Sequence, residues 1–236
     1  MTEPLVLVPG FMCDARVFEP QITTFSAERP VMVSPITTGD TVRDMAAAIL
    51  AGAPAKFALA GLSLGGIVAM EVLRQAPDRV SRLALLDTNP LSETPNGAAA
   101  YEPLLVQAKA GHVEEALRGF MSPDYLAPGP KRMELINLFV RMGQGIGAEV
   151  MTRQVRAMQR RPDQQGTLRR CKVPTLLLCG ALDRLTPPKR HEFMAELIPF
   201  AKLAMIEDAG HLPTLEQPEA TTAALRGWLA QPYVLR

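Results

Sequence analysis

A serine between glycines stands where its hydroxyl could act as a nucleophile. Residues 61–66 read GLSLGG, follow an apolar run at 57–60, and precede a helical pattern at 67–75. In the pattern G-x-S-x-G, small residues let a strand turn sharply into a helix and hold the serine at the apex. Its hydroxyl then projects above the strand ends beside a helix N-terminus, where developing negative charge is favoured. The spacing predicts that Ser63 is a nucleophile.

A serine hydroxyl is a weak nucleophile unless a base accepts its proton. The chain contains three histidines, His112, His191 and His211. His112 begins an expected helix, where it is exposed or caps the helix, and His191 stands on a charged helical face that we expect to be solvated. His211 lies in the loop after the last expected strand, and such loops are where ligands meet an open α/β sheet. We therefore predict His211 as the base.

The base needs an acid that orients it, and two aspartates follow expected strands. Asp183 comes after the strand at 175–179, and Asp87 comes after the strand at 83–86. Asp208 is closer to His211 in sequence and could instead cap the loop. The order Ser…Asp…His accompanies this kind of strand-to-helix turn and favours Asp183. Asp87 remains the alternative.

Acyl transfer also requires donors for a developing oxyanion. One is expected to be the backbone N–H of Leu64, directly after the serine. The other should come from the loop at residues 9–14, where Gly10 allows a tight turn. Phe11 N–H is our first choice and Met12 N–H is the neighbouring possibility. Asp14 is expected to cap the short turn that follows.

The elements that must position these residues alternate along the chain. Short apolar runs ended by Pro, Gly or Ser predict strands. They lie at Leu5–Val8, Val31–Val33, 57–60, 83–86, 175–179 and Lys202–Ile206. Helical patterns occupy residues 42–51, 67–75, 189–197 and 219–229. Continuous apolar strands separated by helices indicate a parallel sheet covered on both faces.

One stretch interrupts this alternation. Residues 88–172 separate two strands, although a parallel crossover needs only about a dozen residues. Within it, Met151, Val155 and Met158 share one helical face, opposite several arginines. We predict a helical cap at 90–168, inserted into a core formed by 1–89 and 169–236. Such an insertion usually covers a site.

Composition excludes several other classes of protein. Lys and Arg number 25 and Asp and Glu 24, giving a net charge of +1, so no global field gathers a polyanion. The spacing of the three cysteines fits no disulfide framework and no zinc site. We expect no metal, no cofactor, and neither nucleic acid nor membrane as partner. The N-terminus does not read as a signal peptide, which favours a cytoplasmic location.

With these residues in place, the sequence resembles the α/β-hydrolase superfamily over essentially its whole length. The matching segments are residues 5–18, 61–66, 83–89, 179–188 and 208–218. The resemblance implies an α/β-hydrolase fold with Ser63 as nucleophile, His211 as base and Asp183 as acid. It also implies that the Phe11 and Leu64 amides bind the oxyanion.

The chain departs from the superfamily pattern at its start. Many relatives have two antiparallel strands before the oxyanion-loop strand, whereas this sequence begins at that strand. We therefore expect a reduced sheet of about six strands, all parallel. Pro9-Gly10 stands where many relatives have His-Gly. The loop also has no run of three glycines, so the sequence resembles esterases with a single donor in this loop.

The substrate follows less directly. We expect the substrate to be a carboxylic ester of small or medium size, contacted by Met12, Asn89 and Leu185. A cap rich in Met and Leu favours an apolar acyl or alcohol group. The same catalytic residues could cleave a C–C bond, thioester, lactone or amide, or the fold could serve as a ligand receptor. Residues 153–172 carry seven basic side chains and one acidic one. They form either a solvated face or a recognition site for an anionic group.

Overall fold

Six parallel strands form one sheet in the computed structural model, which describes residues 2–232. The strands are β1 (Leu5–Val8), β2 (Val31–Val33), β3 (Phe57–Leu62), β4 (Val80–Leu86), β5 (Thr175–Gly180) and β6 (Lys202–Ile206). Their order across the sheet is β2-β1-β3-β4-β5-β6. The predicted reduced, all-parallel sheet is confirmed.

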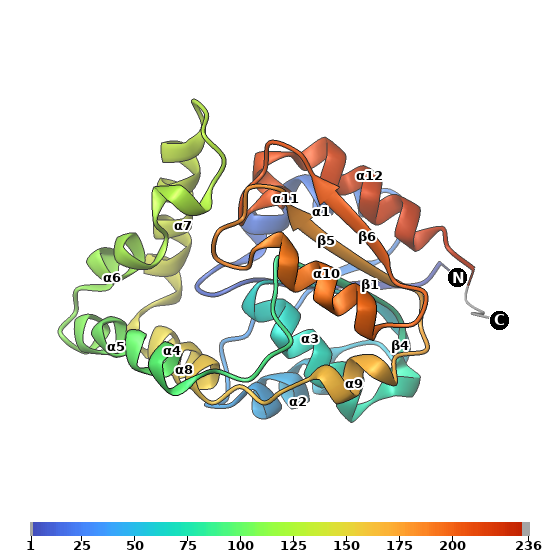
Figure 1. Ribbon diagram of the computed structural model, residues 1–236, viewed down its shortest axis with the longest axis horizontal. Coiled ribbons are helices and arrows are strands. Elements are labelled where there is room, and N and C mark those ends of the chain that lie inside the picture. The colour runs from blue at the N-terminus through green and yellow to red at the C-terminus, as the bar shows by residue number, and fades with distance from the viewer. Residues whose placement is uncertain (1, 233–236) are drawn as a thin grey trace.

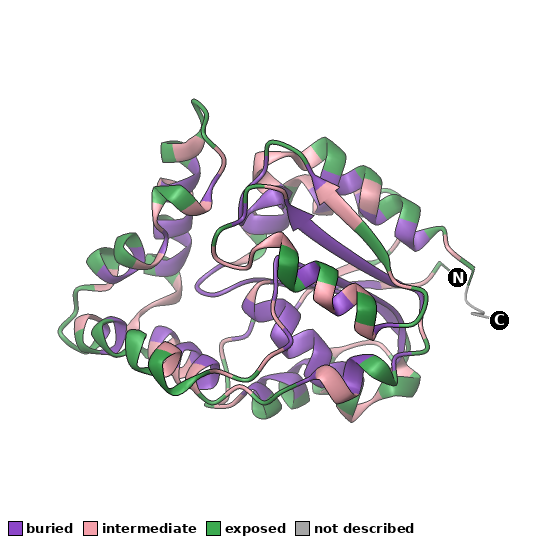
Figure 2. Cartoon of the chain, viewed as in Figure 1, coloured by how far each residue is buried: buried purple, intermediate pink, exposed green. Residues whose placement is uncertain are grey.

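Burial explains why these segments read as unbroken apolar runs. Every residue of β1, β3, β4 and β5 is buried, because helices cover both faces of the sheet (Figure 2). The edge strand β6 is different, since its first residues, Lys202 and Leu203, are exposed. The core therefore sits between the central strands and the two helical layers.

The helices form one layer on each face of the sheet (Figure 1). One layer contains α1 (Glu19–Phe25), α11 (Pro213–Glu216) and α12 (Pro218–Leu229). The other contains α2 (Val42–Gly52), α3 (Leu64–Gln75), α9 (Gln165–Arg169) and α10 (Pro188–Leu197). Two short segments, η1 (Ala15–Phe18) and η2 (Pro77–Arg79), form 3-10 helices. Within residues 2–232, no helix is long and apolar enough to cross a membrane.

The segment between β4 and β5 is helical and extends to one side of the sheet (Figure 1). It contains α4 (Pro95–Ala100), α5 (Glu102–Lys109), α6 (Val113–Phe120), η3 (Pro123–Tyr125), α7 (Arg132–Ile146) and α8 (Ala148–Gln159) before α9. Helices α5 and α8 pack together, as do α6 and α7, whereas α9 packs on α3 and α10. The division into a core and a cap at 90–168 stays a prediction.

Helix α3 begins earlier than its sequence pattern predicts. We expected a start at Ile67, but the helix starts at Leu64, directly after the serine. A side chain at Gly65 would collide with the backbone oxygens of Val8 and Pro9. The glycine is therefore required for close approach to β1 within the helix, and it does not mark a turn.

Candidate active site

Ser63 stands at the turn between β3 and α3 in a strained backbone conformation. Its φ is 53° and its ψ is −118°, a region that residues other than glycine rarely adopt. The backbone around it is tied to β4, because Ser63 N–H donates to Leu86 O at 2.9 Å. Thr88 Oγ1 also donates to Ser63 O at 2.7 Å. These bonds hold the serine at the carboxyl end of the sheet.

The structure brings His211 and Asp183 to this serine. His211 Nε2 lies 2.9 Å from Ser63 Oγ, and His211 Nδ1 lies 2.8 Å from Asp183 Oδ2. His211 and Asp183 are both buried, whereas Ser63 is partly exposed. The three side chains thus form the hydrogen-bonded chain by which a histidine can take a proton from a serine while a carboxylate orients the ring.

Four hydrogen bonds fix the carboxylate of Asp183. Its Oδ1 accepts the backbone N–H groups of Leu185 at 2.7 Å and Thr186 at 3.0 Å. Its Oδ2 accepts Thr186 Oγ1 at 2.6 Å and faces His211. Burial alone would raise the pKa of Asp183, but the attraction of His211 and the donors of Thr186 outweigh it and hold that pKa well below its usual range. Asp183 is therefore ionised at neutral pH.

Glu216 anchors the loop that carries His211. Its carboxylate accepts the N–H groups of Gly210 at 2.9 Å and Leu212 at 2.8 Å, on either side of the histidine. It also accepts Ala127 N–H at 2.6 Å, from the segment between β4 and β5. Our sequence reasoning did not identify Glu216, because nothing local distinguishes it from other glutamates near helix termini.

The backbone amides predicted to bind an oxyanion are free to do so. Neither Phe11 N–H nor Leu64 N–H has a hydrogen-bond acceptor among the described residues. Met12 N–H, the alternative donor, is occupied because it donates to Gln154 Oε1 at 2.9 Å. This leaves Phe11 as the available donor of that loop.

Gln154 is a second residue that the sequence reasoning missed. It lies on α8 and is buried among the apolar residues of that face. Its Nε2 donates to Ile36 O at 2.8 Å while its Oε1 accepts Met12 N–H. One side chain therefore holds the loop at residues 9–14, which we call the oxyanion loop because it carries the amide predicted to bind the oxyanion. The only sequence signal was a polar residue within the apolar stripe formed by Met151, Val155 and Met158.

Replacing Gln154 with leucine should therefore disturb the oxyanion loop. We expect kcat to fall about tenfold, less than for removal of an oxyanion donor itself, because Met12 N–H loses its partner and the loop shifts. The measurement is ester hydrolysis, with Gln159→Leu as control, since Gln159 lies on the same helix and bonds to Ala98 instead. Equal rates for the Gln154 and Gln159 variants would refute this role.

His191 is not solvated, so that prediction is wrong. It is fully buried, and its Nε2 accepts Thr88 N–H at 3.0 Å. Burial lowers the pKa of His191 to about 4, although the charge of Asp183 opposes the shift. The error arose because its charged neighbours face solvent, while His191 and Met194 lie on the side of α10 that packs on β5. His112 is exposed, as expected.

The three residues predicted to contact substrate have different surroundings. Met12 is fully buried, and Asn89 Oδ1 accepts Leu91 N–H within its own turn. Leu185 is partly buried and holds Asp183 through its backbone. Neither Met12 nor Asn89 has a hydrogen bond to Ser63, His211 or Asp183 among the described residues, so their contact with substrate stays a prediction.

Aromatic side chains from the segment between β4 and β5 lie over the oxyanion loop. The ring centroids of Phe11 and Phe120 are 4.5 Å apart, and those of Phe120 and Phe139 are 6.3 Å apart. Phe120 belongs to α6 and Phe139 to α7. These helices therefore bring an apolar wall to the loop that carries the free Phe11 amide.

A cavity of about 1020 Å³ lies away from these residues. It is lined by Val80 at the amino end of β4, together with Lys56, Arg170 and Phe200. Ser63 is bonded to the carboxyl end of the same strand. Because ligands of open α/β sheets bind at strand carboxyl ends, the candidate active site is at Ser63 and not in this cavity.

A parallel sheet that presents a serine at a strand-to-helix turn, hydrogen-bonded to a histidine, is an arrangement typical of α/β hydrolases. The chain belongs to the alpha/beta hydrolase family, whose sequence model matches residues 5–225. The protein is therefore a hydrolase.

Curated relatives and solved structures agree with this assignment. A pimeloyl-[acyl-carrier protein] methyl ester esterase of Aromatoleum aromaticum is 30% identical over 198 residues, covering 77% of each chain. A thermophilic esterase from Thermogutta terrifontis superposes with a TM-score of 0.86 at 29% identity, covering 97% of this chain and 90% of that one. An enol-lactonase from Burkholderia xenovorans has a TM-score of 0.87 at 20% identity, covering 98% and 92%, and shares the fold.

Proposed function

We propose that the protein hydrolyses carboxylic esters through an acyl-enzyme on Ser63. The observation that carries this proposal is the 2.9 Å separation of Ser63 Oγ and His211 Nε2, with Asp183 on the far side of the ring. The similar proteins from Aromatoleum aromaticum and Thermogutta terrifontis are named as esterases, which supports an ester as the bond that is cleaved.

In the proposed mechanism, Ser63 Oγ attacks the ester carbonyl while His211 Nε2 accepts the serine proton. The negative charge that develops on the carbonyl oxygen is stabilised by the N–H groups of Leu64 and Phe11. His211 then gives its proton to the departing alcohol. Water attacks the acyl-enzyme, again with His211 as base, and releases the acid. Asp183 keeps the imidazole oriented and stabilises its charged form throughout.

We further propose that residues 90–168 act as a cap over this site. The rings of Phe120 and Phe139 beside Phe11 would form part of an apolar pocket for the acyl or alcohol group. Hydrolysis of p-nitrophenyl esters from acetate to dodecanoate tests both statements. We expect turnover with an optimum of chain length. Turnover confined to thioester, lactone, amide or C–C substrates, or ligand binding without turnover, would refute the ester proposal.

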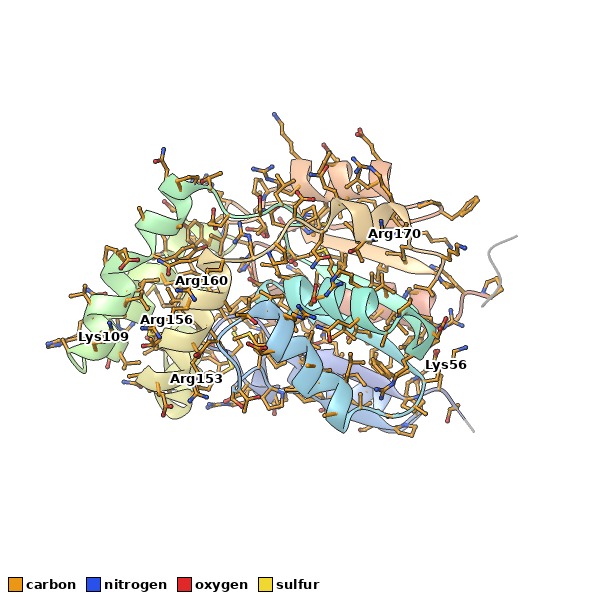
Figure 3. The ribbon with its side chains drawn as sticks, turned by 90° about the horizontal axis from the view of Figure 1, so that it is seen from below. Lys56, Lys109, Arg153, Arg156, Arg160 and Arg170 are labelled. Carbon is orange, nitrogen blue, oxygen red and sulfur yellow. The ribbon has the colours of Figure 1, made fainter. Side chains whose placement is uncertain are left out.

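A basic surface on the cap indicates how a larger ester could be recognised. Arg153 and Arg156 lie on α8, and Arg160 directly follows its last residue. Lys109 ends α5, which packs on α8, and we call these four residues the α8 basic face (Figure 3). Lys109, Arg156 and Arg160 have no ion-pair partner within the described chain, whereas Arg153 pairs with Glu149 at 2.5 Å. Three of these four cations are therefore available to an anionic partner.

We propose that the physiological ester is carried on an acidic carrier protein that docks on the α8 basic face. The curated relatives are named for a pimeloyl group on an acyl-carrier protein. Helix α8 contacts the oxyanion loop through Gln154, which is buried, whereas Arg153 and Arg156 are partly exposed. A partner bound there would lie about one helix diameter, ~10 Å, from the loop.

Replacing Arg156 with glutamate tests this docking. We expect KM for an ester linked to an acidic carrier protein to rise about tenfold relative to KM for p-nitrophenyl acetate, because a rim attraction becomes a repulsion. Raising the salt concentration should reduce this increase in KM, because salt screens the repulsion between charges. Arg170→Glu is the matched control, since Arg170 directly follows α9 and lies well away from α8 (Figure 3). Equal effects of the two substitutions would refute the docking site.

A further inference from the structure

Asp87 is a buried carboxyl group that the proposed reaction does not use. It directly follows β4, is fully buried, and has a positive φ of 42°. Its Oδ1 accepts Gly180 N–H at 2.9 Å. Its Oδ2 is also buried, yet no group among the described residues donates a hydrogen bond to it. Burying an acceptor without a donor costs free energy of folding, so the missing hydrogen bond of Oδ2 needs an explanation.

The neighbour of Asp87 is the acid of the proposed triad. A carboxyl oxygen of Asp87, one of Asp183 and the Cys179 sulfur all lie within 4.8 Å of one another. Two buried carboxylates this close strongly disfavour ionisation of both. Asp183 has two backbone donors, the Thr186 hydroxyl and His211, whereas Asp87 has a single donor. The negative charge therefore belongs on Asp183 and the shared proton on Asp87.

The other titratable groups around Asp87 favour the same assignment. Glu216, on α11, adds negative charge, and Cys179, on β5, is a buried thiol whose pKa burial raises. His191, on α10, accepts Thr88 N–H through Nε2 and is neutral. His211 is the remaining possible cation, and it faces Asp183 directly. Burial, followed by the charge of Asp183, raises the pKa of Asp87 well above its usual range.

We propose that Asp87 is a positioning residue that stays protonated and donates a hydrogen bond from Oδ2 to the carboxylate of Asp183. This proton gives the otherwise unpartnered Oδ2 a role. It also limits the pair of carboxyl groups to one negative charge, so the imidazolium of His211 is stabilised without its proton being held too tightly. The inference rests on the proposed function only for the role of Asp183 in the reaction, not for the location of the proton.

Whether the buried pair of Asp87 and Asp183 holds a proton can be measured without any substrate, and the kinetic comparison that follows tests which residue carries it. Unfolded Asp87 is ionised above about pH 5. If the native residue is protonated, wild type binds one more proton when folded than when unfolded, and its stability falls as pH rises. The unfolding constant of wild type, relative to that of Asp87→Asn, should then increase about tenfold per pH unit between pH 5 and 7. A ratio independent of pH would overturn the proposal.

The positioning role is tested by the pH dependence of ester hydrolysis. Asp87→Asn can still donate to Asp183, so it should keep the acid limb of the wild-type kcat profile and most of the rate. Asp87→Leu cannot donate and should lower kcat about tenfold with little change in KM. If Asp87 were ionised, the Asn variant would instead move the acid limb to lower pH by about one unit. That shift, or equal kcat for the Leu and Asn variants, would contradict the role.

These two measurements separate this inference from the proposed function. If wild type hydrolyses no ester but the ratio of the two unfolding constants rises tenfold per pH unit, the ester proposal fails and the shared proton of the Asp87–Asp183 pair stands. If hydrolysis depends on Ser63 but the ratio of the unfolding constants of wild type and Asp87→Asn does not change with pH, the ester proposal stands and the role of Asp87 is refuted.

Discussion

Replacing Ser63 with alanine is expected to lower kcat for ester hydrolysis by roughly 10⁴- to 10⁶-fold. The variant lacks the hydroxyl that we propose forms the acyl-enzyme, since Oγ is the atom that lies 2.9 Å from His211 Nε2. The free Phe11 and Leu64 amides would remain and could support a small residual rate by water attack. The measurement is kcat on the best p-nitrophenyl ester, with wild type assayed in parallel.

Covalent labelling gives the same prediction a second readout. A fluorophosphonate should label wild type on one serine and leave Ser63→Ala unlabelled. Ser26→Ala is the matched control, because Ser26 is exposed and its hydroxyl donates to the nearby Thr23 O. The control should be labelled like wild type. Labelling of Ser63→Ala at the wild-type rate would remove Ser63 from the mechanism, and loss of labelling in the control would indicate general misfolding.

Local sequence was sufficient to predict the fold of the core. The strands were found because β1, β3, β4 and β5 are buried on both faces, which demands unbroken apolar runs. The turn at Ser63 was found because its geometry requires small residues at fixed positions on either side of the serine. In both cases the physical constraint acts within a few residues of the chain.

Long-range contacts were out of reach of this reasoning. Gln154 bonds to Met12 across 142 positions, and Glu216 bonds to Ala127 across 89. Local composition even misled at His191, whose charged neighbours concealed a side chain that faces the core. The pattern could propose Ser63, His211 and Asp183, but the residues that support them depend on how the segment between β4 and β5 packs on the sheet.

Replacing Asp183 with asparagine is the second substitution with a large expected effect. We expect kcat/KM to fall about 10³- to 10⁴-fold, because the amide would favour the wrong tautomer of His211. The Oδ1 position accepts the N–H groups of Leu185 and Thr186, so the amide oxygen must occupy it. The amide NH₂ is then left facing His211 Nδ1.

That orientation determines the result. An NH₂ group opposite Nδ1 makes this nitrogen an acceptor and moves the ring proton to Nε2, which can then no longer accept the proton of Ser63. Asp87→Asn is the comparison, because Asp87 has no hydrogen bond to His211 in the described chain and its amide can still donate to Asp183. Kinetics of both variants, with thermal unfolding to verify folding, provide the test. If Asp87→Asn were the more damaging change, the acid that orients His211 would be Asp87, and the protonated carboxyl group of the pair would be Asp183.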